Sequence, residues 1–310
     1  MPSLRVIFLG TPQFALPSLE AVHRRFGIQL VVSQPDRPGG RGQKLTPPPV
    51  AVRARELGIA LYQPEKLRAP QAVAPLAELQ PDVICVVAFG QILKPVVLDL
   101  PRLGCINVHA SLLPKYRGAA PIQWALMAGE TVTGATTMRL DPGMDTGDLL
   151  LSRQVAIGPD ETAMELSARL AVVGAEVLVE TLEGLLAGRM TPTPQDHSQA
   201  TYARLLKKED GLVDWSLSAQ TLYNRFRGLQ PWPGLYTLWQ GGLLKLSAVQ
   251  PLADTAPPGT IAQMTRSGLA VGTGSGSLLI SAVQPSSKAV MSAADFARGR
   301  RLAPGERLGA

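Results

Sequence analysis

"PDVICVVAFG", residues 81–90, is an almost unbroken run of apolar residues between Pro81 and Gly90. A β-strand has this composition when helices cover both faces of its sheet, because neither face of the strand then meets water. Parallel sheets with helices on both sides are built from such strands. The stretch therefore predicts a central strand of a mostly parallel α/β sheet.

Similar apolar runs alternate with helical patterns on both sides of this stretch. The sequence predicts strands over residues 5–9, 28–34, 104–109, 132–140 and 149–157. It predicts helices over residues 14–26, 50–57, 71–80, 118–129 and 162–187. This alternation indicates a Rossmann-like α/β domain in residues 1–189. In open sheets of this kind, ligands bind beyond the carboxyl ends of the strands.

The composition changes after residue 189. Residues 190–208 are polar, contain prolines and have a weak periodicity, which is typical of a linker. Short β-like runs separated by glycine and proline follow over residues 235–239, 243–249, 259–264, 268–272 and 277–283. These runs predict a small OB-like β-barrel in residues 209–310. Trp215, Trp232 and Trp239 are expected to fill its core, although each could stack on an RNA base.

The charge of the chain is basic and unevenly distributed. The net charge is +6, and residues 190–310 hold 12 of the 30 Lys and Arg residues but only 7 of the 24 Asp and Glu residues. A basic domain is typical of proteins that bind a polyanion such as nucleic acid, and a solvated basic surface is the alternative.

The cysteines and the apolar runs bear on the compartment. Cys85 and Cys105 are the only cysteines, and both lie in strand-like apolar runs, which favours two buried thiols in a reducing compartment. Two cysteines and three scattered histidines give no metal site of the Cys/His type. No apolar stretch approaches the roughly 18 residues of a membrane span. We therefore expect a cytoplasmic protein without a metal.

One proline- and glycine-rich segment, "QPDRPGGRGQKLTPPPV" at residues 34–50, fits neither a helix nor a central strand. It carries the cations Arg37, Arg41 and Lys44. Long irregular segments inside compact domains are usually functional or disordered. The alternatives are a tolerated surface insertion and a basic loop that contacts a phosphate backbone.

The pair Asn107 and His109 ends the predicted strand over residues 104–109. Side chains two residues apart on a strand share a face, so both point the same way. An Asn amide can donate a hydrogen bond to a developing oxyanion, and a His can donate one or move a proton. The loop over residues 141–148 offers Asp141, Asp145 and Asp148, and we expect it to approach the same edge of the sheet. These residue types suit direct acyl transfer to an amine, although a strand-end Asn-x-His pair is often structural.

"INVHASLLPKYRGAAPIQWAL" at residues 106–126, together with "DPGMDTGDLL" at 141–150, resembles the signature of the folate-dependent formyltransferases. Further matches narrow the resemblance to members that formylate methionyl initiator tRNA: "RVIFLGTPQFALPSL" at 5–19, the 34–50 segment, "LLKKEDGLVDWS" at 205–216 and "PWPG" at 231–234. The match extends through both predicted domains. One departure is Phe89, where the family often has Tyr.

The resemblance implies the roles of the site residues. Asn107 and His109 would stabilise the oxyanion while Asp145 orients and charges His109. The formyl donor, 10-formyltetrahydrofolate, would bind near Phe89, Gly90, Gln91, Ile92, Ser111, Leu112, Leu113, Pro114 and Asp141. The tRNA would contact Arg37, Arg41 and Lys44. We expect a monomer that uses no metal.

Three other functions fit less well. A sugar-nucleotide N-formyltransferase would use the same donor, but the basic 34–50 segment argues against it. A nucleotide-binding dehydrogenase would need Gly-x-Gly-x-x-Gly after the first strand, whereas Gly10 is followed by Thr11, Pro12 and Gln13. A non-catalytic RNA-binding module would explain the charge but not the Asn, His and Asp together.

Overall fold

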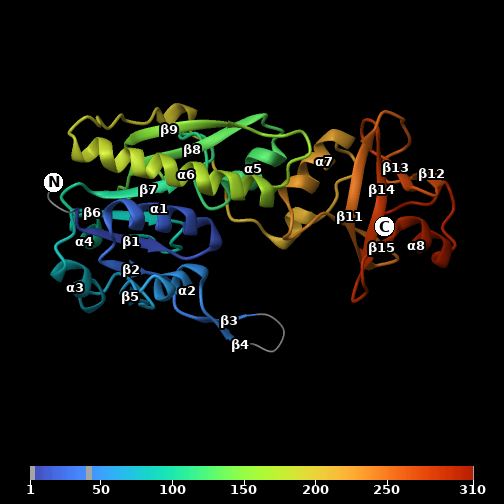
Figure 1. Cartoon of the computed structure of the whole chain (residues 1–310). Coiled ribbons are helices and arrows are strands. Elements are labelled where there is room, and N and C mark those ends of the chain that lie inside the picture. Colours follow the sequence, from blue (N-terminus) through green and yellow to red (C-terminus); the bar gives the residue numbers. More distant parts are fainter. Residues whose placement is uncertain (1–3, 40–43, 310) are drawn as a thin grey trace. The chain divides into compact units, whose positions relative to one another are not determined.

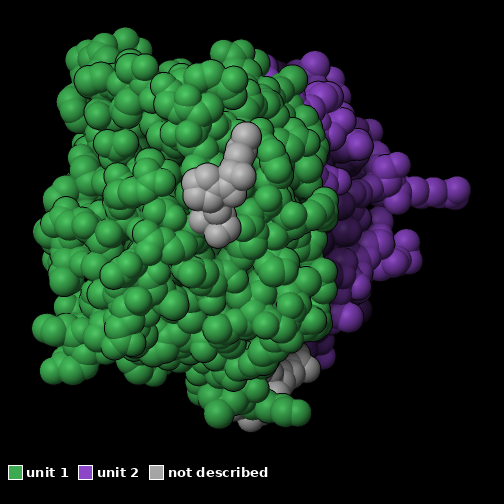
Figure 2. All heavy atoms as spheres, turned by 60° about the vertical axis from the view of Figure 1, so that its left-hand side comes forward, with its two compact units in different colours: residues 1–121, 132–156, 167–204 green, residues 122–131, 157–166, 205–310 purple. Residues whose placement is uncertain are grey.

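The computed structural model of the chain describes residues 4–39 and 44–309 (Figure 1). The chain forms two compact units (Figure 2). Unit 1 comprises residues 1–121, 132–156 and 167–204, and unit 2 comprises residues 122–131, 157–166 and 205–310. The first unit is an α/β domain, and the second is rich in antiparallel strands.

A seven-stranded sheet forms the centre of unit 1 (Figure 1). Its strands in spatial order are β5 (Leu61–Tyr62), β2 (Leu30–Val32), β1 (Val6–Gly10), β6 (Val83–Val87), β7 (Cys105–His109), β8 (Val132–Arg139) and β9 (Leu149–Ala156). The first five strands are parallel, and β8 and β9 are antiparallel to their neighbours. The prediction of a mostly parallel sheet is confirmed, with residues 81–90 supplying the central strand β6. The short strand β5 was not predicted.

Helices cover both faces of this sheet. Helices α1 (Leu16–Phe26), α2 (Pro49–Glu56) and α6 (Ala163–Leu186) contribute to the hydrophobic core on one face. Helices α3 (Pro70–Glu78) and α4 (Pro95–Leu98) contribute to the core on the other. Helix α1 follows the short helix η1 (Gln13–Ala15) and ends at Gly27, whose φ of 75° favours glycine. The burial of β6 on both faces explains its unbroken apolar sequence.

Residues 34–50 contain more order than the sequence predicts. Strands β3 (Arg37–Gly39) and β4 (Lys44–Thr46) pair in an antiparallel ribbon that is separate from the main sheet. Pro38 is tolerated there because a two-stranded ribbon consists only of edge strands. Helix α2 then begins at Pro49, one residue before the predicted helix. Arg41 lies outside the described residues.

Residues 190–204, which the sequence predicts to be part of a linker, lie in unit 1. Thr193 exchanges two backbone hydrogen bonds with Leu149, and Tyr202 forms an isolated bridge with Arg117. The short helix η2 (His197–Gln199) lies between these contacts. This segment therefore belongs to the α/β domain, and the chain passes into the C-terminal part of unit 2 at residue 205.

The sheet of unit 2 is antiparallel and has six strands. In spatial order they are β10 (Tyr236–Trp239), β11 (Gly242–Leu252), β14 (Ser277–Pro285), β13 (Gly268–Gly272) and β12 (Ile261–Thr265), with β15 (Met291–Ser292) paired to β14. The helical elements in or near this unit are α5 (Pro121–Met127), η3 (Lys208–Gly211), α7 (Ala219–Gly228) and α8 (Ala293–Arg300). The strand-rich C-terminal domain is confirmed, whereas α7 and α8 were not predicted.

Both cysteines are free thiols and fully buried, as the sequence predicts. Burial raises the pKa of the Cys105 thiol to about 12. Within residues 4–39 and 44–309, no helix combines the length and the apolar character that crossing a bilayer requires.

Asp82 joins the starts of β1 and β6. Its carboxylate accepts hydrogen bonds from the Arg5 backbone N–H (2.9 Å), the Arg5 guanidinium (3.2 Å) and Arg102 Nε (2.9 Å). The side-chain hydrogen bonds from Arg5 are the main reason why the pKa of Asp82 is held well below its usual range. The ionised carboxylate therefore stabilises the folded state.

We expect Asp82→Asn to lower the free energy of unfolding at pH 7 by about 1.5–3 kcal/mol, the value of a hydrogen bond to a charged group. Because the folded pKa is depressed, this contribution is complete above the unfolded carboxyl pKa of about 3.9 and is lost as the pH falls through the folded value. The difference in the free energy of unfolding between parent and variant, measured by urea unfolding, should begin to narrow below about pH 5 and go on narrowing toward about pH 1. Asp99→Asn, which changes an exposed carboxylate, is the control. A gap that does not depend on pH would contradict the assignment.

Candidate active site

Strand β7 carries Asn107 and His109 to its carboxyl end. Ile106 and Val108 on the same strand point into the core that contains α1 and α6. Since side chains alternate along a strand, Asn107 and His109 face the opposite side of the sheet. This arrangement agrees with the prediction that Asn107 and His109 share a face.

Asn107 lies between Val86 of β6 and Met138 of β8 in the sheet. Its side chain is half-buried, and its amide makes no hydrogen bond to any residue in the ranges that the structure describes. An amide that is held on a rigid strand without a partner is available to donate to a bound substrate.

His109 is only 6 % exposed, and its two ring nitrogens have different neighbours. Nε2 lies 2.9 Å from the carbonyl oxygen of Tyr116. A carbonyl can only accept a hydrogen bond, so Nε2 carries a proton and donates. Nδ1 lies 3.7 Å from Oδ2 of Asp145. Nδ1 is therefore the position at which the ring gains or loses its second proton.

The loop over residues 141–148 approaches the end of β7, as expected, and brings Asp145 beside His109. Strand β8 is antiparallel to β7, so it ends beside the start of β7, where the Leu140 N–H donates to the Cys105 carbonyl (2.8 Å). The 141–148 loop must then fold back along β7 to place Asp145 near His109. Asp145 has a φ of 53°, and its Oδ2 accepts a hydrogen bond from the Gly118 N–H (2.8 Å).

Two buried polar residues that the sequence did not single out hold this loop. Arg117 is 2 % exposed, and its Nη2 and Nε donate to Oε1 of Gln195 (2.7 and 3.1 Å). Nε2 of Gln195 donates to the carbonyls of Asp145 (2.9 Å) and Gly147 (2.7 Å). Gln195 lies in the predicted linker, where no local pattern distinguishes it.

The residues predicted to bind the formyl donor after β6 have varied surroundings. The Phe89 side chain is buried in the core beside α3 and α4, and its carbonyl accepts from Thr11 Oγ1 (2.8 Å). Gly90 has a φ of 86°, and Gln91 Oε1 accepts from the Leu67 N–H (2.8 Å). Ile92 is 79 % exposed. The exposed backbone at Gly90 and the exposed side chain of Ile92 are therefore available to contact a flat ring.

The other predicted donor contacts follow β7 and β8. Ser111 is buried, and its hydroxyl donates to the Lys115 carbonyl (2.6 Å). The peptide bond between Leu113 and Pro114 is cis. Asp141 accepts hydrogen bonds from the Gly143 N–H (3.0 Å) and Thr146 Oγ1 (2.7 Å), which shapes the 141–148 loop. Leu112 packs closely on Gly134, and a side chain at position 134 would collide with a methyl group of Leu112.

Of the residues predicted to bind tRNA, two lie on the β3–β4 ribbon. Arg37 forms an ion pair with Glu65 (2.6 Å) in which both side chains are exposed. Lys44 is exposed on β4. Arg41 cannot be placed because residues 40–43 lie outside the described ranges.

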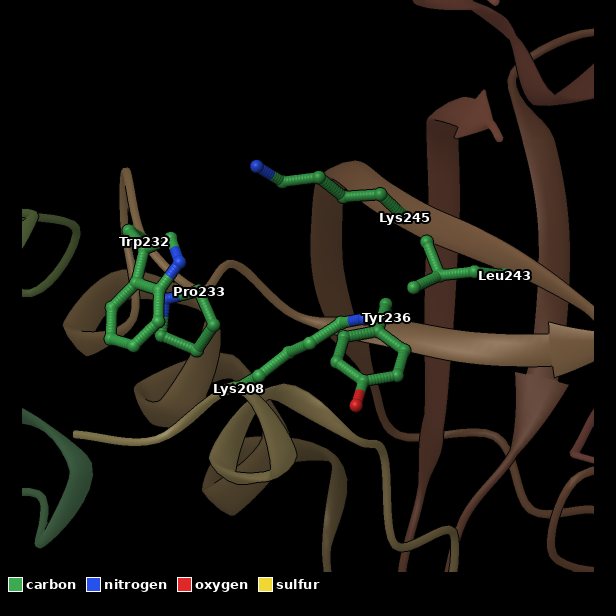
Figure 3. A pocket seen from close by; sticks show the side chains of 6 residues that line it. All are labelled: Lys208, Trp232, Pro233, Tyr236, Leu243 and Lys245. Carbon is green, nitrogen blue, oxygen red and sulfur yellow. The ribbon is translucent and has the colours of Figure 1, made fainter. Parts of the chain in front are cut away.

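Unit 2 contains a pocket of about 130 Å³ lined by Lys208, Trp232, Pro233, Tyr236, Leu243 and Lys245 (Figure 3). Trp232 is 55 % exposed, so the expectation that it fills the core is wrong. Trp215 is buried, as expected, whereas Trp239 is only half-buried and packs edge-on against Phe296 at 5.3 Å. Nζ of Lys245 donates to the Pro231 carbonyl (3.3 Å) beside the exposed indole.

The chain is similar to known proteins over most of its length. A family model described as "Formyl transferase" matches residues 4–182, and "Formyl transferase, C-terminal domain" matches residues 205–301. A methionyl-tRNA formyltransferase from Geobacter metallireducens is 53% identical over 310 residues, which are 100% of both chains. One from Solibacter usitatus is 52% identical over 309 residues, 99% of each chain.

Two solved structures share the fold at low identity. An N-formyltransferase from Helicobacter canadensis, in complex with folinic acid and dTDP-3-aminofucose, matches with a TM-score of 0.66 and 15% identity over 91% of this chain and 99% of its own. HypX from Aquifex aeolicus with tetrahydrofolic acid matches with a TM-score of 0.63 and 18% identity over 95% of this chain but only 47% of its own.

Proposed function

The chain belongs to the formyl transferase family, and from this premise we infer that it passes a formyl group from a folate-derived donor to the amino group of methionyl-tRNA. Relatives with that activity in their name match it over its whole length. The observation that carries the assignment to a site is the convergence of Asn107, His109 and Asp145 at the end of β7.

The proposed reaction is a direct acyl transfer. The methionine nitrogen attacks the formyl carbon, and a new C–N bond forms while the carbonyl oxygen becomes an oxyanion. Asn107 donates to that oxygen through its free amide. The bond from the formyl carbon to the donor nitrogen then breaks, the donor nitrogen takes up a proton, and the amine loses one.

His109 and Asp145 act together in this proposal. With Nε2 committed to the Tyr116 carbonyl, proton transfer is confined to Nδ1, which faces the Asp145 carboxylate. In its protonated form the ring pairs with this carboxylate. A positive charge beside the reacting carbon stabilises the oxyanion, and the same nitrogen can relay the proton of the amine.

The donor in this proposal is 10-formyltetrahydrofolate. The loop that contains Gly90 and Ile92 follows β6 in the sheet, and β6 is next to β7. Ile92 and Met144 are exposed apolar side chains on the loops after β6 and β8, and they suit the flat, partly apolar ring of a pterin. Backbone groups of residues 111–114 would contribute hydrogen bonds.

The tRNA in this proposal contacts both units. The β3–β4 ribbon carries Arg37 and Lys44 to the acceptor end. Arg41, which lies outside the described residues, is proposed to contact the same end. The pocket of unit 2 offers the exposed Trp232 ring for stacking and the ammonium groups of Lys208 and Lys245 for phosphates. Both kinds of contact are typical of RNA recognition and explain the basic charge of the C-terminal part.

We expect binding of tRNA to weaken strongly with salt, because each phosphate contact releases counterions. Lys208→Ala combined with Lys245→Ala should reduce the slope of log affinity against log salt by about 1–2, which filter binding at several salt concentrations would measure. Lys288→Ala, which removes an exposed lysine elsewhere in unit 2, should leave the slope nearly unchanged. A double variant with the parental slope would remove these lysines from the interface.

The decisive assay presents the chain with 10-formyltetrahydrofolate and one of two acceptors, methionyl initiator tRNA or an amino-sugar nucleotide. Formyl methionine on the tRNA is the expected product. Formylation of the sugar amine alone would reject the proposed acceptor and favour the sugar-nucleotide alternative.

A further inference from the structure

We propose that Gln195 is a positioning residue that sets the placement of Asp145 against His109, a role that rests on the proposed function. Its amide nitrogen donates to the carbonyls of Asp145 (2.9 Å) and Gly147 (2.7 Å), on both sides of Thr146. It ties the folded-back 141–148 loop to residues 190–204 of unit 1.

Arg117 holds Gln195 in the orientation that this role needs. An amide could rotate by half a turn and exchange its oxygen and nitrogen. The guanidinium of Arg117 can only donate, and it donates twice to Gln195 Oε1. The nitrogen of Gln195 must therefore face the loop carbonyls. Arg117 is buried, so its charge polarises the amide in a medium of low dielectric and strengthens the hydrogen bonds to the loop.

The same segment also holds the other neighbour of His109. The Tyr116 N–H donates to Thr201 Oγ1 (2.8 Å), and the Arg117 N–H donates to the Thr201 carbonyl (2.8 Å). Tyr116 and Asp145 thus approach opposite nitrogens of the ring while residues 195–201 hold both of them.

Backbone strain indicates that this support is needed. Asp145 has a φ of 53° and Tyr116 a φ of 61°, in the left-handed region that residues other than glycine seldom adopt. Such conformations persist only where the surrounding structure holds them. Among the described residues, Gln195 is the side chain of residues 190–204 that donates to the Asp145 backbone. Without Gln195, this hydrogen bond would be lost. The carboxylate would then move away from Nδ1.

Two variants test the role by different means. Gln195→Met keeps the length of the side chain but removes both polar atoms. Gln195→Glu keeps an acceptor for Arg117, so the buried cation stays paired. It replaces the donor to the loop by an oxygen that repels the carbonyls of Asp145 and Gly147. Gln199→Met is the matched control, because Gln199 is exposed on the same segment and bonds only to Asp196 in the described chain.

We expect both Gln195 variants to lower kcat by about 10–100-fold, the size of effect that a displacement of about 1 Å produces. The KM values for the formyl donor and for tRNA, and the melting temperature of Gln195→Glu, should stay near those of the parent and of Gln199→Met. A fall in kcat accompanied by equal rises in both KM values, or a parental kcat in Gln195→Glu, would overturn the proposal.

A double-variant cycle then separates positioning from general support. In single-turnover assays, Gln195→Glu should cost little further rate in an Asp145→Asn background, because its effect is exerted through Asp145. The same loss of rate in both backgrounds would show that Gln195 acts independently of Asp145. The parent chain in these assays tests the formyl transfer itself, so failure of the proposed function appears as an inactive parent.

Discussion

Asn107→Ala should lower kcat by about 10²–10³-fold, which corresponds to the 2.7–4 kcal/mol that one oxyanion donor contributes. The amide is half-buried on the central part of a rigid sheet and makes no hydrogen bond within the described residues. Its removal therefore leaves no partner unsatisfied, and folding should not suffer. The measurement is single-turnover formylation of methionyl-tRNA, with thermal melting as the control for folding.

Asn107→Asp provides the matched comparison. Asp has nearly the same shape, but its carboxylate accepts hydrogen bonds and repels a developing oxyanion. The Asp variant should therefore be at least as slow as the Ala variant, although it fills the site better. Turnover near the parental value in either variant would exclude Asn107 from the mechanism.

The parts of the fold that the sequence predicts are those with a local periodicity. Strand β6 is recognisable because burial on both faces requires a continuous apolar run, and β7 because the apolar residues lead into Asn107 and His109. Short elements such as β5 lack enough residues for a pattern. Helices α7 and α8 lie among Gly- and Pro-flanked strands and were missed.

The contacts that complete the site could not be predicted because they are distant in sequence. Arg117 and Gln195 are 78 residues apart, and Gln195 lies in a polar, weakly periodic segment. The return of the 141–148 loop along β7 follows from the antiparallel pairing of β8, which apolar periodicity does not reveal. Exposure of Trp232 likewise depends on tertiary packing.

Asp145→Asn should lower kcat by about 10²–10⁴-fold, in the range lost when a proton-transfer system is impaired. Asn is nearly isosteric with Asp and tolerates positive φ, so it can keep the backbone conformation of residue 145. In the parent chain the Gly118 N–H donates to Oδ2 of Asp145 (2.8 Å). The side-chain oxygen of Asn can accept the same hydrogen bond. The geometry of the loop should survive, and only the negative charge beside His109 is removed.

The loss of rate therefore reports the charge and not the support that Asp145 gives to the loop. Asp148→Asn removes a carboxylate from the same loop. Among the described residues, His109 forms its ion pair with Asp145 and none with Asp148, so we expect kcat within about twofold of the parent. If Asp145→Asn also turned over at the parental rate, the histidine would not need a carboxylate at Nδ1.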